Sequence, residues 1–191
     1  YILTRMEDSG LSYQEIFAEA DGLGYLEADP QLDVGGIDAA HKLAILSSIA
    51  FSTKVDFDGI VIEGIERVSI EDINAAADMG YKIKLLGVTQ MTGRGLEQRM
   101  QPCLVPAHTP IGQLDGVTNA VVIEGDQAGQ IFLQGPGAGA GPTASAIMAD
   151  VVDIARGLIG PALGLPAAQL VSAPRAGDAS AAEFYLRLLL K

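Results

Sequence analysis

The sequence predicts an α+β fold in which helices pack on one face of a mixed, mostly antiparallel sheet. Two observations carry this prediction. Apolar residues at helical spacing, preceded by Ser-led caps, dominate the chain up to residue 79, whereas extended apolar runs separated by Gly-rich turns occupy residues 81–134. Segregation of helices and strands in this way favours two packed layers. With 191 residues, 49% of them hydrophobic, the chain is long enough to bury a core.

The helices of the first half are indicated by their ends and their periodicity. Residues 1–7 are predicted to be the end of a helix. Ser12, with Glu15 three residues later, has the spacing of a capping box and begins the next helix. A third helix is predicted over residues 36–51, and its apolar residues cover most of its circumference, which indicates a largely buried helix.

The second half begins with another capped helix and continues in strands. Ser69 and Asp72 form a second capping box, for a helix over residues 70–79. Strands are expected at residues 60–65, 81–91, 96–105, 117–124 and 130–134, and a last helix at residues 143–157. Short turns join residues 81–91 to 96–105 and residues 117–124 to 130–134, so each of these two pairs is predicted to be antiparallel.

The last part of the chain changes in composition. Residues 161–182 are rich in Ala, Pro and Gly and are interpreted as a linker. Residues 183–191 contain one apolar, strand-like run. Because a single strand cannot bury itself, this run is interpreted as the first strand of another domain. The chain also begins without Met, so we expect it to be a piece of a longer protein.

Charge and cysteine content restrict the class of protein. A net charge of −12 disfavours nucleic acid and anionic membranes as partners, because both would repel the chain. No apolar run approaches the length of a membrane span. Cys103 is the single cysteine, so no internal disulfide can form, and a reducing compartment, the cytoplasm, is expected. His41 and His108 have no ligand-type spacing with each other or with Cys103, so no metal site is predicted.

Residues 24–42 concentrate charged side chains in a short stretch. Glu27 and Asp33 lie on a loop punctuated by Gly and Pro, and Asp38 lies at the start of a helix. Lys42 follows Asp38 by four residues, which places both on one face of that helix. An acidic loop beside a helix-borne lysine suits a small cationic metabolite whose oxygen gains or loses a proton.

Two interpretations of this stretch are open. In the simpler one, Asp38 and Lys42 form a surface ion pair worth about 0.3–0.5 kcal/mol, and the loop acids belong to ordinary turns. In the functional one, the apolar helix leaves Lys42 partly desolvated, so that it exchanges a proton near neutral pH while Asp38 orients it. The loop carboxylates then form a cage for an ammonium group, with Tyr25 as one wall.

A glycine-rich loop over residues 134–145 leads into the last predicted helix. Such a loop offers backbone N–H groups and the positive end of a helix dipole to a phosphate or to the edge of a cofactor. The residues expected to bind there are Gly135, Gly137, Gly139, Gly141 and Thr143. The loop lacks the G-x-G-x-x-G fingerprint, and a flexible connector is the open alternative.

The ordered string from Gly24 to Leu43 resembles the signature of homoserine dehydrogenases. Residues 1–3 resemble the segment after the family's Gly-Thr-Thr-Asn turn, and residues 135–145 resemble its later glycine loop near the nicotinamide. Gly35 departs from the pattern, because many relatives carry an acid there. The resemblance extends to about residue 157.

The resemblance also implies an organisation of the chain. Residues 1–160 would be the catalytic and dimerisation domain, without the nucleotide-binding domain that precedes it in the family. Residues 184–188 resemble the opening strand of an ACT regulatory domain. A homodimer is expected, and the isolated chain is expected to have little activity.

The family interconverts L-aspartate semialdehyde and L-homoserine with NAD(P)H, a step of threonine and methionine biosynthesis. The resemblance implies that Lys42 donates a proton to the aldehyde oxygen and that Asp38 supports it. It also implies that Glu27 and Asp33 hold the substrate's amino group, with Tyr25 close by. Hydride passes directly from NAD or NADP to carbon, so the protein supplies orientation and one proton.

Two other functions stay open at this stage. One is a non-catalytic module of the same fold that binds an amino acid or dimerises. The other is a dehydrogenase of similar two-domain design that acts on a different amino-aldehyde. An enzyme requires the ammonium group of Lys42, whereas a binding module should tolerate Lys42→Met with little loss of affinity.

Overall fold

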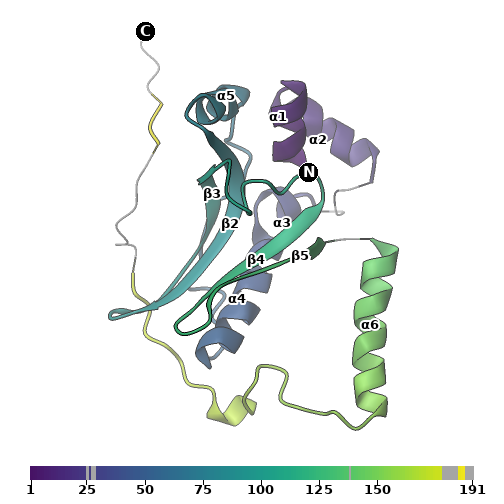
Figure 1. The fold of residues 1–191 in the computed structure, drawn as a ribbon, viewed down its shortest axis with the longest axis vertical. Coiled ribbons are helices and arrows are strands. Elements are labelled where there is room, and N and C mark those ends of the chain that lie inside the picture. The colour runs from purple at the N-terminus through teal and green to yellow at the C-terminus, as the bar shows by residue number, and fades with distance from the viewer. Residues whose placement is uncertain (25, 27–28, 138, 178–184, 188–191) are drawn as a thin grey trace.

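The computed structural model describes residues 1–24, 26, 29–137, 139–177 and 185–187. Its elements follow in the order α1 (Ile2–Ser9), α2 (Tyr13–Gly22), α3 (Gln31–Val34), α4 (Ile37–Phe51), β1 (Val61–Ile62), α5 (Ile70–Asp78), β2 (Tyr81–Thr92), β3 (Gly95–Pro106), β4 (Thr118–Gly125), β5 (Gly129–Pro136), α6 (Ala140–Ala155) and a 3₁₀ turn, η1 (Ala167–Gln169). The α+β class is confirmed, with helices α4 and α5 packed against the β2–β3 hairpin (Figure 1).

The strands form two sheets. In the larger one the order is β1-β3-β2. The β2–β3 pair is antiparallel over its full length, with Tyr81 opposite Pro106 and Thr92 opposite Gly95, whereas β1 is parallel to β3. Within the described residues, β4 and β5 pair only with each other, as a separate hairpin. The predicted strand at 60–65 is reduced to the two residues of β1.

Both predicted capping boxes are confirmed. The Ser12 hydroxyl accepts from the Glu15 N–H, and the Ser69 hydroxyl accepts from the Asp72 N–H, with the acid returning a bond to the cap residue in each case. Each reciprocal pair satisfies two N–H groups that the first helical turn leaves without partners. These local bonds explain why α2 and α5 begin where the sequence predicts.

The core consists of two clusters. One joins α1, α2 and α5 through residues that include Met6 and Ile16, both fully buried, with Val34 from α3. Burial of one such side chain stabilises the fold by about 1.5–3 kcal/mol. The other cluster joins Ala40, Leu43 and Ala44 of α4 to Ile60 and to Met100 of β3. The second cluster fixes the buried face of α4.

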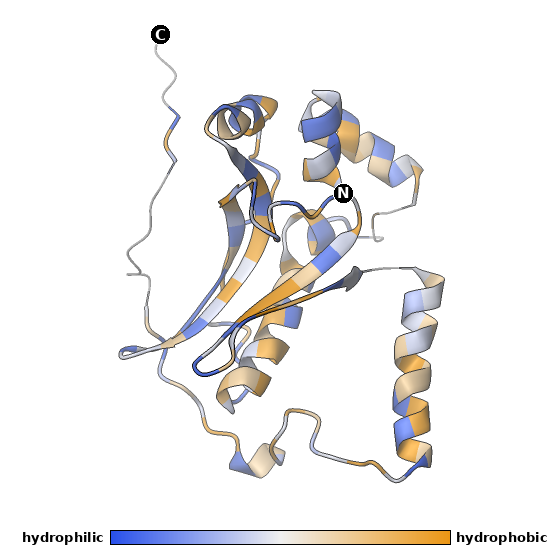
Figure 2. Cartoon of the chain, in the orientation of Figure 1, coloured by the Kyte–Doolittle hydropathy of each residue, from blue (hydrophilic) through white to orange (hydrophobic). Residues whose placement is uncertain are grey.

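Two helices are more exposed than the sequence predicts. On α4 the side chains of Ile45, Leu46 and Ile49 are 42–47% exposed, so the expectation of a largely buried helix is wrong for the described part of the chain. Helix α6 has no buried residue, and its large apolar residues are exposed. In Figure 2 the helix stands apart from the sheets and carries hydrophobic residues along its length. The hydropathy pattern identifies an apolar face on each of these helices. Within the described residues, nothing packs against the exposed apolar residues of these faces.

The segment after α6 turns back towards the main body (Figure 1). Residues 170–176 contact the chain just after α4 and the first residues of β3. The linker prediction for 161–182 falls partly outside the described residues, and so does the strand predicted at 183–191. Residues 185–187, which are described, are not in a strand.

No helix among the described residues has both the length and the apolar character needed to cross a membrane.

Candidate active site

The first element of the candidate site is α3, a short helix that is not predicted from the sequence. Helix α3 follows Asp29-Pro30, and the Asp29 Oδ1 atom accepts from the Gln31 N–H at 3.1 Å. Asp before Pro is a helix-start signal, because the carboxylate caps the first turn and proline has no N–H to lose. Asp29 therefore lies one residue before the N-cap Pro30, and its carboxylate binds the first N–H group of α3.

The turn between α3 and α4 is held by Gly64. The Ile65 N–H donates to the Val34 carbonyl at 2.9 Å. A Cβ atom at Gly64 would lie 2.4 Å from that carbonyl oxygen and 2.8 Å from the Gly35 Cα atom. Only glycine allows this approach of two backbone segments. The contact fixes the point at which α4 starts.

Helix α4 carries the charged pair. The Lys42 Nζ atom donates to Asp38 Oδ2 at 2.5 Å, across one helical turn. Asp38 lies in the first turn of α4, where the helix dipole stabilises a carboxylate. The two side chains are 60% and 53% exposed. The partial burial of Lys42 expected from the apolar helix is therefore absent from the described structure, and the pair faces solvent.

The opposite face of α4 is anchored in the protein. The Ser47 hydroxyl donates to the Leu43 carbonyl at 2.7 Å and lies 2.9 Å from the Thr89 hydroxyl on β2, within hydrogen-bonding distance. The ring of His41 stacks on Phe57 with centroids 4.2 Å apart. These contacts fix the rotation of α4, so Asp38 and Lys42 project away from the sheet.

The acidic loop is described only in part. Asp33 lies half-buried on α3, which packs against α4. A short connection joins α3 to α4. Asp33 on α3 therefore lies on the helix that directly precedes the one carrying Asp38 and Lys42. Tyr25 and Glu27, the other residues predicted to bind substrate, lie outside the described residues.

The glycine-rich loop joins β5 to α6. Gly135 belongs to β5, and the Gly137 N–H donates to the Val117 carbonyl at 3.3 Å. Gly139 caps α6, with Gly141 and Thr143 in the first turn. The Thr143 N–H donates to the Gly139 carbonyl at 3.1 Å. The predicted glycines thus surround a helix start, although the helix begins three residues earlier than expected.

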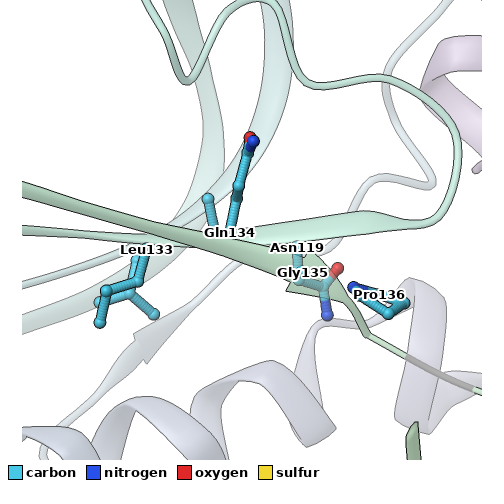
Figure 3. A pocket seen from close by; sticks show the side chains of 7 residues that line it. Asn119, Leu133, Gln134, Gly135 and Pro136 are labelled. Carbon is cyan, nitrogen blue, oxygen red and sulfur yellow. The ribbon is translucent and has the colours of Figure 1, made fainter.

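A surface pocket lies beside this loop. Asn119 from β4 and Leu133, Gly135 and Pro136 from β5 are among the residues that line it, and Figure 3 shows Gln134 pointing away from Leu133 across the hairpin. No hydrogen bond or ion pair among the described residues joins the loop to Lys42. The structure therefore presents the charged pair and the glycine loop as two separate features.

Cys103 does not resemble a nucleophile. It is half-buried on β3, and burial raises the pKa of its thiol. Its Sγ atom donates to the Gln101 carbonyl at 3.5 Å. This agrees with a packing role for Cys103.

A family model for homoserine dehydrogenase matches residues 1–152.

The chain belongs to the homoserine dehydrogenase family.

The relatives support the assignment over most of the chain. The homoserine dehydrogenase of Pseudomonas aeruginosa is 47% identical over 158 residues, which make up 83% of this chain and 36% of that relative. The crystal structure of a homoserine dehydrogenase from Thiobacillus denitrificans has a TM-score of 0.86 at 43% identity, covering 91% of this chain and 42% of that one. A hyperthermophilic archaeal homoserine dehydrogenase in complex with NADPH has a TM-score of 0.67 at 28% identity, covering 82% and 44%. The chain thus spans less than half the length of these relatives.

Proposed function

We propose that this chain is the substrate-binding and catalytic portion of an NAD(P)-dependent homoserine dehydrogenase, an oxidoreductase of amino-acid biosynthesis. Its substrates would be L-aspartate semialdehyde and L-homoserine. The observation that carries the proposal is the Asp38–Lys42 pair, which α4 holds open to solvent within the part of the chain that matches the family. The exposure of the pair leaves the Lys42 ammonium group accessible to a substrate.

Lys42 is the proton donor in this proposal. When bound, NAD(P)H supplies the hydride that adds to the aldehyde carbon. The electron pair of the C=O π bond moves to the oxygen, which takes a proton from the Lys42 ammonium group to form the hydroxyl. Lys42 is left as a neutral amine and regains its proton from water, since its side chain is 60% exposed. Asp38 holds the Lys42 ammonium group in position through its hydrogen bond.

The substrate's ammonium group would be held by carboxylates of the acidic loop. Asp33 on α3 is the described member of this set, and Glu27 and Tyr25 complete the proposal. Two carboxylates beside an ammonium group would orient the aldehyde towards Lys42 through charge-assisted hydrogen bonds. This arrangement selects amino-aldehydes over aldehydes without a positive charge.

The residues proposed to contact the cofactor are Gly135, Gly137, Gly139, Gly141 and Thr143. The geometry fits, because space beside Gly135 and Gly141 is open where a side chain would otherwise project, and α6 begins there. Backbone N–H groups at a helix start bind the electron-rich edge of a ligand. The archaeal relative in complex with NADPH supports NADP, with NAD as the alternative. We further propose a cytoplasmic homodimer.

The test is homoserine-dependent formation of NADPH or NADH by the full-length protein. We expect turnover with homoserine, and aspartate semialdehyde should compete with homoserine more strongly than other amino-aldehydes do. If a folded full-length protein binds homoserine but reduces neither cofactor, the non-catalytic binding module replaces this proposal. If another amino-aldehyde is preferred, the reaction class stands and the substrate assignment is wrong.

A further inference from the structure

The segment that follows η1 is attached to the main body by backbone hydrogen bonds. Lys54 N–H donates to the Val171 carbonyl at 2.9 Å. Further along, Leu96 N–H donates to the Pro174 carbonyl at 2.8 Å, and Ala176 N–H donates to the Leu96 carbonyl at 3.0 Å. Residues 174–176 therefore pair in parallel with the start of β3, and Val171 pairs in parallel with Thr53 just after α4.

Side chains strengthen this attachment. Arg175 donates to Asp56 through two bonds, Nε to Oδ2 at 2.7 Å and Nη2 to Oδ1 at 2.6 Å. Two such parallel hydrogen bonds fix the orientation of the Arg175 guanidinium group as well as its distance from the Asp56 carboxylate. The Asp56 carbonyl also accepts from the Gln98 Nε2 atom on β3 at 3.0 Å, and Leu170 is 5% exposed. One apolar anchor and one forked ion pair thus hold the two ends of the segment.

Gly95 makes the close approach possible. Its φ is +130°, and a Cβ atom there would lie 2.1 Å from the Pro174 carbonyl oxygen. No other residue fits both this conformation and this contact. The first residue of β3 is therefore shaped to receive the segment.

We propose that residues 170–176 form a clasp, locked by the Asp56–Arg175 pair, that joins the chain beyond residue 177 to the end of α4. In the last turn of α4, the Ser48 hydroxyl donates at 2.5 Å to the carbonyl of Thr53, which lies just after the helix and pairs with Val171. The clasp therefore contacts the last turn of α4 through Thr53. The helix that carries Lys42 is thereby coupled mechanically to the chain that follows, a consequence for catalysis that rests on the proposed function.

A second attachment lies further along. Arg187 Nε is 2.8 Å from Asp72 Oδ1, and the Tyr185 hydroxyl donates to Asp72 at 3.4 Å. Asp72 is the N3 residue of the capping box that begins α5, so residues 185–187 contact the start of that helix.

The test is amide hydrogen exchange in the 191-residue chain, read at Lys54, Leu96 and Ala176. In the unaltered chain we expect these amides to be protected. Arg175→Ala should accelerate their exchange about fivefold, the effect of losing one partly exposed ion pair. Arg156→Ala, which removes an exposed arginine at the end of α6, is the matched control and should leave them unchanged.

Two further variants distinguish the lock from a general loss of stability. Gly95→Ala should accelerate exchange at Leu96 and Ala176 while both charges remain. The charge exchange of Asp56→Arg with Arg175→Asp should restore protection towards that of the unaltered chain. Unprotected amides in the unaltered chain, an unchanged rate in Arg175→Ala, or no recovery in the double variant would each overturn the clasp. None of these measurements depends on enzymatic activity, so they are independent of the proposed function.

Discussion

Gly64→Ala should destabilise the protein by displacing the turn that sets the start of α4. The new Cβ atom would lie 2.4 Å from the Val34 carbonyl oxygen and 2.8 Å from the Gly35 Cα atom. Ordinary contacts at such positions begin near 3.4 Å, so one backbone segment has to move by about 1 Å. Both obstructing atoms belong to the backbone and cannot rotate away as a side chain would.

Overpacking of this kind costs about 1–3 kcal/mol. For a chain of this size, a loss of about 2 kcal/mol lowers Tm by roughly 4–8 °C. Thermal unfolding measured by circular dichroism, with urea titration for the free energy of unfolding, gives both quantities. Gly93→Ala is the matched control, because no atom lies within 4 Å of its added Cβ.

The position of Gly64 also predicts an effect on the site. The displaced turn should disturb the first turn of α4 and lower kcat of the full-length protein more than the Gly93 control does. Gly64→Ala with a free energy of unfolding within about 0.5 kcal/mol of the unaltered chain would refute the reasoning, because surface changes away from contacts stay in that range.

Three further predictions concern stability. Met6→Ala should cost about 2–5 kcal/mol in urea unfolding, because Met6 is 0% exposed; a loss below 1 kcal/mol would contradict its core position. Ser52→Gly should raise stability by about 0.5–1 kcal/mol in the same assay, since Ser52 has φ 54°; a loss would show that the serine side chain is needed there. Hydrogen bonds from Arg175 lower the pKa of Asp56 below its ordinary 3.8. The stabilisation that they give is therefore complete above pH 3.8 and is lost as pH falls through the lowered pKa. The free energy of unfolding, measured from pH 2 to 6, should show this pH-dependent loss in the unaltered chain but not in Arg175→Ala, and identical profiles would exclude the effect.

Local features of the fold could be predicted from the sequence. The capping boxes at Ser12 and Ser69 depend on residues three positions apart, and the β2–β3 register follows from a short turn between adjacent strands. The spacing of Asp38 and Lys42 likewise fixed their shared face on α4. These features require no knowledge of distant parts of the chain.

Features that depend on distant partners could not be predicted. Asp56 and Arg175 are 119 positions apart, and neither has a local sequence signal. The exposure of Lys42 depends on what packs beside α4, which hydropathy does not specify. Helix α3 is different, because Asp followed by Pro is a local signal for a helix start as well as for a turn.

The central claim, that Lys42 donates the proton, is tested most directly by kcat of Lys42→Ala in the full-length protein with homoserine and the preferred cofactor. Lys54→Ala, which changes another exposed lysine just after α4, is the control. The account predicts a loss of about a hundredfold or more for Lys42→Ala, typical of a missing general acid, with the control unchanged. Equal kcat values for both variants would contradict the assignment of Lys42 while leaving membership of the family intact.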